Sequence, residues 1–154
     1  MSKYIVIIFF VLASTSSFAQ GIEWETDYPT ALNKAHAANK NLVIFFNDGS
    51  NPQKESIIRK KIFKSKIFKK LSKSSVGLLV ESSQNSEKGR FNSRVISGYN
   101  AYKAFPAIKV INLQNGINLS LLKDFDESSI DSFLNNITEL QRRLESLIVN
   151  EILN

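Results

Sequence analysis

The sequence predicts an α/β fold in which a central mixed sheet is flanked by helices on both faces. Two unbroken apolar runs, residues 42–46 and 76–80, are typical of strands that are covered on both sides. Segments with apolar residues at helical spacing precede and follow these runs. A chain of 154 residues with 43% hydrophobic residues and 11 Phe can fill one core. We therefore expect a single domain.

Residues 1–19 have the composition of a signal peptide. A lysine near the start is followed by an apolar run at residues 4–13, and Ser17 and Ala19 are small residues at the cleavage positions. A membrane-spanning helix needs about 20 residues, so we expect cleavage, with an uncleaved anchor as the alternative. With no cysteine for lipid attachment, the mature protein is expected to be periplasmic or secreted.

The chain is poor in the side chains that carry most redox and metal chemistry. It contains no Cys and a single His, His36. These counts exclude thiol–disulfide catalysis and thiolate metal sites, and one imidazole leaves no plausible histidine-based zinc site. We therefore expect no catalytic residue, no metal and no cofactor, with His36 on or beside a helix surface. The net charge of +6 favours an anionic partner or only aids solubility.

The first half of the chain reads as helix, strand, loop and helix. The first helix is expected near residues 28–36, with Asp27 or Thr30 as its cap. The strand at 42–46 leads into a polar loop at 47–55 with the sequence NDGSNPQKE.

A long basic amphipathic helix is expected after this loop, at residues 56–73. The strand at 76–80 and a polar loop at 81–88 follow it. A weaker helix is expected at 90–102, with Phe91, Val95, Ile96 and Tyr99 as its buried positions.

The second half is expected to contain a hairpin and a final helix. A strand at 107–113, a turn at 114–116 and a partner strand at 117–122 form the hairpin. The final helix begins after Asp126 with Ser128 or Ser129 as its cap. Unbroken, it would be about 27 residues and roughly 40 Å long.

The end of the final helix is predicted to need a partner. Its apolar stripe extends beyond the length of a sheet, and exposed contiguous apolar surface is uncommon in monomers. We expect homodimerisation or docking to another protein through Leu140, Leu144, Leu147 and Ile148. The alternative is that the helix breaks near residues 139–143 and folds back.

Several separated residues together resemble a known family. They are, in chain order, Trp24, Tyr28, Ala31, Leu32, Ala35, Asn39, Lys40 and the run 42–46. This pattern resembles secreted thioredoxin-like proteins of the thioredoxin-7 and anterior-gradient type, over about residues 22–125. The resemblance implies a thioredoxin-like core at 20–125, completed by the helix at 126–154.

The resemblance also implies where reactive thiols would stand. In that family a Cys-x-x-Cys or Cys-x-x-Ser motif precedes a helix that ends in Val-Phe or Ile-Phe. Ile62 and Phe63 match that pair, which places the two motif positions at Pro52 and Glu55. Disulfide exchange needs a thiolate nucleophile, so the resemblance implies a fold whose chemistry is absent.

A cis proline opposite the motif is the second feature of the family, and Phe105-Pro106-Ala107 matches it. The resemblance implies that the backbone beside this proline pairs with an extended polypeptide by strand addition. The residues of the resulting cleft would be Asn51, Pro52, Gln53, Glu55, Phe105 and Pro106. The alternative is that Pro106 only shapes a turn and the cleft is vestigial.

The basic helix is a second candidate surface, for contact with anionic lipid, acidic polysaccharide or an acidic protein. Its candidate residues are Arg59, Lys60, Lys64, Lys66, Lys69, Lys70 and Lys73, beside Lys54 and Lys61. Export and the lack of interleaved aromatic residues argue against nucleic acid. A solvated helix face is the alternative.

The sequence thus predicts an exported, non-catalytic thioredoxin-like module that binds a protein or peptide, as an adaptor or chaperone-like subunit. An enzyme that uses Asp48 or Glu55 for acid–base chemistry is one competing hypothesis, although Glu55 is more simply an ordinary acidic residue at a helix N-terminus. A structural or surface-associating envelope protein is the other.

Overall fold

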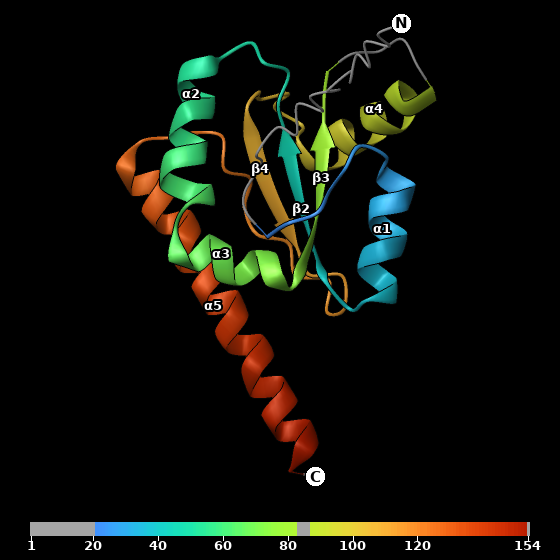
Figure 1. Ribbon diagram of the computed structural model, residues 1–154, viewed down its shortest axis with the longest axis vertical. Coiled ribbons are helices and arrows are strands. Elements are labelled where there is room, and N and C mark those ends of the chain that lie inside the picture. Colours follow the sequence, from blue (N-terminus) through green and yellow to red (C-terminus); the bar gives the residue numbers. More distant parts are fainter. Residues whose placement is uncertain (1–20, 83–86, 154) are drawn as a thin grey trace, which may run out of the picture.

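The computed structural model describes residues 21–82 and 87–153 and contains a four-stranded mixed sheet (Figure 1). The strand order is β1-β3-β2-β4, with β1 (Trp24–Glu25), β3 (Ser75–Val80), β2 (Asn41–Phe46) and β4 (Ala107–Ile111). β1 and β2 are parallel to β3, and β4 is antiparallel to β2. The predicted mixed α/β sheet is confirmed. The predicted signal peptide and the centre of the polar loop at 81–88 lie outside the described residues.

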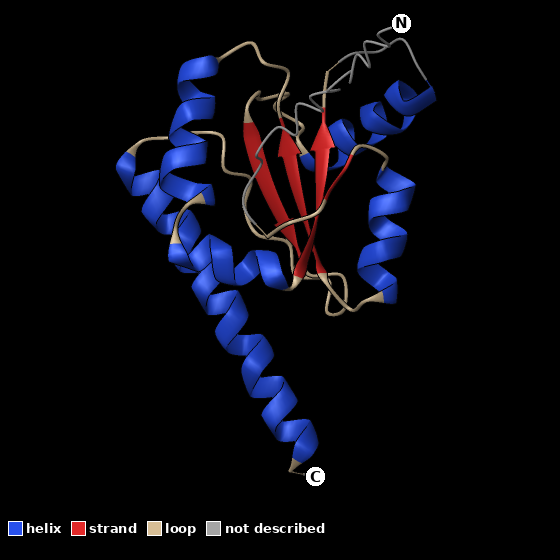
Figure 2. Cartoon of the chain, in the orientation of Figure 1, coloured by secondary structure: helices blue, strands red, loops and turns tan. Residues whose placement is uncertain are grey.

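Helices cover both faces of this sheet (Figure 2). One layer contains α2 (Pro52–Ile57), the π-helix η1 (Ile58–Phe63), α3 (Lys66–Lys73) and α5 (Glu127–Ile152). The other contains α1 (Tyr28–Ala37) and α4 (Glu87–Tyr99). Among the helices of the described ranges, none has the length and apolar character that crossing a bilayer requires.

The central strand β2 supplies both halves of the core. All six of its residues are buried, as its continuous apolar sequence predicts. Successive side chains of a strand point to opposite faces. Val43 and Phe45 therefore pack towards the layer of α2, η1, α3 and α5, whereas Ile44 and Phe46 pack towards α1 and α4. On the first face, the Phe45 ring meets Phe63 edge-on at 5.3 Å between centroids.

The strand β1 was not predicted, because two residues give no periodic signal. It places the Trp24 side chain over Gly77 of β3, where an added Cβ would lie 2.6 Å from Trp24 Cε3. Gly77 is therefore required by close packing rather than by an unusual backbone conformation.

The single helix predicted at 56–73 is wrong in two respects. The helix starts earlier, at Pro52, because Asn51 accepts a hydrogen bond from the Lys54 amide at 3.0 Å and proline suits the first helical position. It then continues as the π-helix η1, which ends at Phe63. Ser65 begins α3 by accepting a hydrogen bond from Phe68 N at 3.1 Å.

The partner strand predicted at 117–122 is replaced by two isolated antiparallel bridges, Ile108 with Leu122 and Ile111 with Asn118. Three residue steps separate the bridges along β4 and four separate them along the partner. The extra residue forms a bulge, which interrupts strand pairing. As a result Leu119 and Leu122 pack against the same half of the core.

The helices α4 and α5 differ from expectation at their ends. α4 starts at Glu87, and Phe91, predicted as buried, is 40% exposed. Asp126, rather than Ser128 or Ser129, caps α5 by accepting from Ser129 N at 2.9 Å. α5 is continuous for 26 residues, so the alternative of a break at 139–143 is wrong.

Candidate binding surfaces

The loop that follows β2 is held by its own polar side chains. The Gly49 amide donates to Asn47 Oδ1 at 3.3 Å, and the Ser50 amide donates to Asp48 Oδ1 at 3.0 Å. Gly49 has a φ of 74°, a left-handed conformation that glycine adopts without strain. Asn47 N also donates to Val80 O at 3.0 Å. The loop therefore leaves the sheet where β2 and β3 both end.

The two positions where the resemblance implies thiols lie in the first turn of α2. Pro52 is exposed at the start of the helix. Glu55 is half-buried, and its Oε1 accepts from Arg59 Nη2 at 2.5 Å and from Arg59 Nε at 2.9 Å. The two positions where the resemblance implies thiols are therefore occupied by a proline and by a carboxylate that is ion-paired with Arg59. Neither group can attack a disulfide.

The Phe105–Pro106 peptide bond is cis, as the resemblance implies. Ala107 pairs with Phe46, the last residue of β2, in the antiparallel register. Pro106, the residue before Ala107, therefore lies beside the end of β2 where the loop begins. Pro106 is buried. The Phe105 ring is half-buried and meets Phe46 edge-on, with 6.2 Å between centroids, on the face that α1 and α4 cover.

In the predicted cleft, the main-chain segments thus lie closer to one another than the side chains do. The start of β4 and the loop after β2 lie at one end of the sheet. Pro52 and Gln53 are exposed on α2, which covers one face, whereas the Phe105 ring packs towards the other face. Any ligand of this end of the sheet would meet main chain at Phe105 and side chains at Gln53.

The carboxylates near this end are arranged as structural groups. The hydrogen bond from Ser50 holds the pKa of Asp48 below its usual range, which keeps it ionised and unsuited to donate a proton. The Glu55 carboxylate is ion-paired with Arg59. His36 is exposed on α1, on the opposite face from α2. Within residues 21–82 and 87–153, no three His, Cys, Asp or Glu side chains gather to hold a metal ion.

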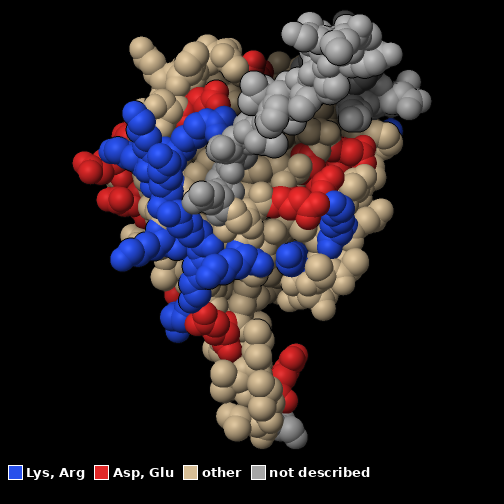
Figure 3. All heavy atoms as spheres, in the orientation of Figure 1, with Lys and Arg blue, Asp and Glu red and all other residues tan. Residues whose placement is uncertain are grey.

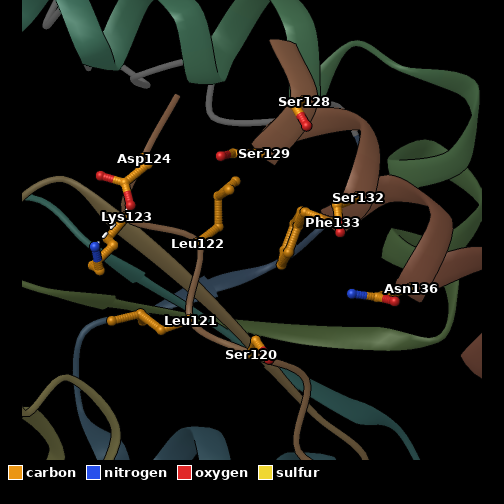
Figure 4. Close-up of a pocket in the computed structure, with 10 residues that line it drawn as sticks. All are labelled: Ser120, Leu121, Leu122, Lys123, Asp124, Ser128, Ser129, Ser132, Phe133 and Asn136. Carbon is orange, nitrogen blue, oxygen red and sulfur yellow. Dashed lines mark hydrogen bonds and ion pairs between the residues drawn. The ribbon is translucent and has the colours of Figure 1, made fainter. Parts of the chain in front are cut away.

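A cavity of about 330 Å³ lies between the bulged segment and the start of α5, and sequence reasoning missed it (Figure 4). It is lined by Ser120, Leu121, Leu122, Lys123, Asp124, Ser128, Ser129, Ser132, Phe133 and Asn136. Lys123 pairs with Asp124 at 2.7 Å, and Ser129 Oγ donates to Asp126 at 2.6 Å. The spacing of three serines in the first turns of a helix was its only sequence signal. The hydroxyl, amide and charged groups of this lining offer polar contacts to a ligand.

The basic surface forms a continuous patch over α2, η1 and α3 (Figure 3). Its exposed members are Lys54, Lys60, Lys61, Lys64, Lys66, Lys69, Lys70 and Lys73, with Arg59 half-buried. Arg59 is paired with Glu55, and Lys70 with Glu145 at 2.8 Å. Nine cations and one acid in residues 54–73 give this face a strong positive potential.

The predicted partner helix is divided by the structure. Leu140 is buried in the protein's own core and Leu144 packs against that core. Beyond them α5 projects from the body as a stem (Figure 1). Leu147 is 52% exposed and Ile148 is 57% exposed, so these two of the four predicted residues are available to a partner.

The fold is similar to that of solved thioredoxin-like proteins. A DsbH oxidoreductase matches with a TM-score of 0.55 and 21% identity over 76% of this chain and 87% of that chain. A thioredoxin from Thermus thermophilus matches with a TM-score of 0.55 and 16% identity over 78% and 87%. A chain of the complex of ferredoxin:thioredoxin reductase with thioredoxin f2 matches with a TM-score of 0.52 and 16% identity over 80% and 99%.

These similarities show a thioredoxin-like fold, in agreement with the prediction. No protein-family model and no curated protein sequence matches the chain.

Proposed function

We propose that the protein is an exported, non-catalytic thioredoxin-like module that binds an extended polypeptide. The observation that carries the proposal is the occupation of the two expected thiol positions, on an otherwise thioredoxin-like fold, by Pro52 and the ion-paired Glu55. With the chemistry absent, binding is the remaining use of the end of the sheet.

The geometry that supports the proposal is the position of the main chain before β4, at the end of the sheet where β2 ends. The register that sets Ala107 against Phe46 leads the Phe105–Pro106 segment past the end of β2. A polypeptide could add to this segment by main-chain hydrogen bonds, and α2 would then offer Gln53 and Pro52 to its side chains. The internally bonded loop after β2 lowers the entropy lost on binding, because little of it needs ordering.

The finer assignments belong to the same proposal. The family resemblance of residues 22–125 supports the secreted thioredoxin-7 and anterior-gradient type, and the composition of residues 1–19 supports export to the periplasm or beyond. An adaptor or chaperone-like role in an envelope complex fits a binding surface without chemistry. No cofactor is required for such a role.

A permanently unfolded polypeptide is the appropriate probe. Binding of reduced, carboxymethylated α-lactalbumin is measured by fluorescence anisotropy for the wild type, Phe105→Ala and Gln53→Ala. Gln53→Ala is expected to bind about tenfold more weakly, because it removes a side-chain contact with the polypeptide. Phe105→Ala is expected to bind more weakly as well, because the ring that packs against Phe46 anchors the main chain to which the polypeptide would add. Leu113→Ala is the control, because Leu113 packs against the same half of the core just beyond the other end of β4.

Equal affinity of wild type, Phe105→Ala and Gln53→Ala would contradict the proposal. A loss in Leu113→Ala as large as in Phe105→Ala would also contradict it, since the effect would then follow core stability. Thermal melts of all four proteins separate these cases.

A further inference from the structure

The stem of α5 ends in an apolar tip that the rest of the described protein leaves uncovered. Its large exposed residues are Leu147 (52%), Ile148 (57%), Val149 (53%), Ile152 (77%) and Leu153 (77%). They fall on several sides of the helix, so one flat protein partner would cover only some of them. A stem that enters at an angle would bury these side chains among the headgroups, where the apolar groups of interfacial helices reach a depth of about 5–10 Å.

The tip adjoins the basic patch. Lys70 of α3 pairs with Glu145 of α5 at 2.8 Å, two residues before the tip begins. Figure 3 shows the Lys and Arg side chains of α2, η1 and α3 on the same visible face as the stem. Exposed cations and an exposed apolar end therefore occur next to each other on one side of the molecule.

We propose that this combined surface docks on an anionic lipid bilayer, with the tip inserted among the headgroups and the patch lying on them. Apolar burial and attraction to anionic lipid reinforce each other at such surfaces. An acidic polysaccharide would use the lysines and leave the tip in water. The proposal is independent of the polypeptide-binding function, because none of these residues lies in the predicted cleft.

A second copy of the chain fits this surface less well. Two stems packed antiparallel about Ile148 would set Glu145 of each copy opposite Glu151 of the other, and would bring two equally charged basic patches together. An anionic bilayer meets the patch with opposite charge. Glu151 is the one acid of the tip, and Glu151→Gln is expected to strengthen lipid binding a few-fold.

Vesicle flotation with the full mature chain tests the proposal. The vesicles are phosphatidylcholine alone, or with about one third phosphatidylglycerol, in about 0.1 M and about 0.5 M NaCl. The wild type is expected to float only with the anionic vesicles and to be released by high salt. Lys64→Gln/Lys66→Gln/Lys69→Gln should bind roughly 100-fold more weakly, about fivefold for each lysine.

Matched variants separate the two components. Ile148→Ser/Ile152→Ser should bind at least about tenfold more weakly, because the lost apolar insertion is not replaced by charge. Lys40→Gln/Arg94→Gln/Lys103→Gln lowers the net charge equally, at exposed or half-exposed positions outside the patch, and should bind as the wild type does.

Several results would overturn the proposal. The first is no flotation of the wild type with anionic vesicles. The second is a loss of flotation in Lys40→Gln/Arg94→Gln/Lys103→Gln as large as in Lys64→Gln/Lys66→Gln/Lys69→Gln. The third is unchanged flotation of the tip variant, Ile148→Ser/Ile152→Ser. Stronger retention on heparin than on vesicles with no effect of the tip variant would assign the patch to a polysaccharide. A doubled mass in light scattering that Ile148→Ser/Ile152→Ser abolishes would assign the tip to a second copy.

Discussion

Two cysteines placed at the inferred motif positions should introduce disulfide chemistry. In Pro52→Cys/Glu55→Cys the thiols stand three residues apart in the first turn of α2. Their Cα atoms are then about 5 Å apart by helix geometry, inside the range that a disulfide bridges. The double variant should therefore form an intramolecular disulfide without movement of the main chain.

The expected reactivity follows from the charges around position 52. A thiol at a helix N-terminus beside cations has a lowered pKa, and the change removes Glu55, the one acid of residues 54–73, and frees Arg59 from it. A pKa near 7 in place of about 8.5 raises the thiolate fraction at about pH 7 from about 3% to about half, roughly 15-fold. Loss of the partly exposed Glu55–Arg59 pair should cost at most about 1 kcal/mol of stability.

The assay is reduction of insulin by dithiothreitol, followed as turbidity. The double variant should accelerate precipitation, and the wild type should match the blank. Gln53→Cys/Ser56→Cys is the control, because it has the same spacing rotated about 100° around the helix and retains Pro52 and Glu55. Equal turnover by the two double variants would refute the assignment of positions 52 and 55, as would a variant that forms the disulfide and remains inactive.

Two further predictions concern the fold. Gly77→Ala should lower the free energy of unfolding by about 1–3 kcal/mol, because its Cβ would lie 2.6 Å from Trp24; urea titration followed by the fluorescence of Trp24 measures this. Gly98→Ala, in α4 with no atom within 4 Å of the added Cβ, should be neutral or stabilising, and an equal loss in both would contradict the packing argument. Hydrogen bonds from Ser129 lower the pKa of Asp126, so its stabilisation of α5 is present above the unfolded pKa of about 4 and is lost as pH falls through the lower folded value. Melting temperatures from about pH 6 to about pH 2 should therefore fall less for Asp126→Asn, which keeps a capping oxygen, than for the wild type; parallel curves would show that Asp126 makes no such contribution.

The sequence was most informative where one strong pattern fixed one element. Continuous apolar residues identified β2 and β3, and helical spacing identified α5 with nearly its full length. The cis peptide bond at Pro106 followed from the family resemblance rather than from any local pattern. The absence of cysteine is visible directly in the composition, and the assignment of Pro52 and Glu55 to the two motif positions rests on the family resemblance.

Features that depend on tertiary contacts could not be read from local patterns. β1 exists because Trp24 packs over Gly77, two residues that lie far apart in the sequence. The bulge between Asn118 and Leu122 changes the face on which successive leucines lie, so the regular strand that the alternating pattern predicts does not form there. The direction of the Phe105 ring, towards α1 and α4, was equally invisible in a motif that specifies only order along the chain.

The measurement that tests the central proposal most directly is chemical-shift mapping of the isotopically labelled mature protein with an unfolded polypeptide. Binding at the end of the sheet predicts that amide signals of the non-proline residues in 47–53 and 104–107 shift together and saturate at one affinity. Shifts confined to residues 54–73, or no shifts at probe concentrations that saturate a thioredoxin carrying its cysteines, would contradict the account.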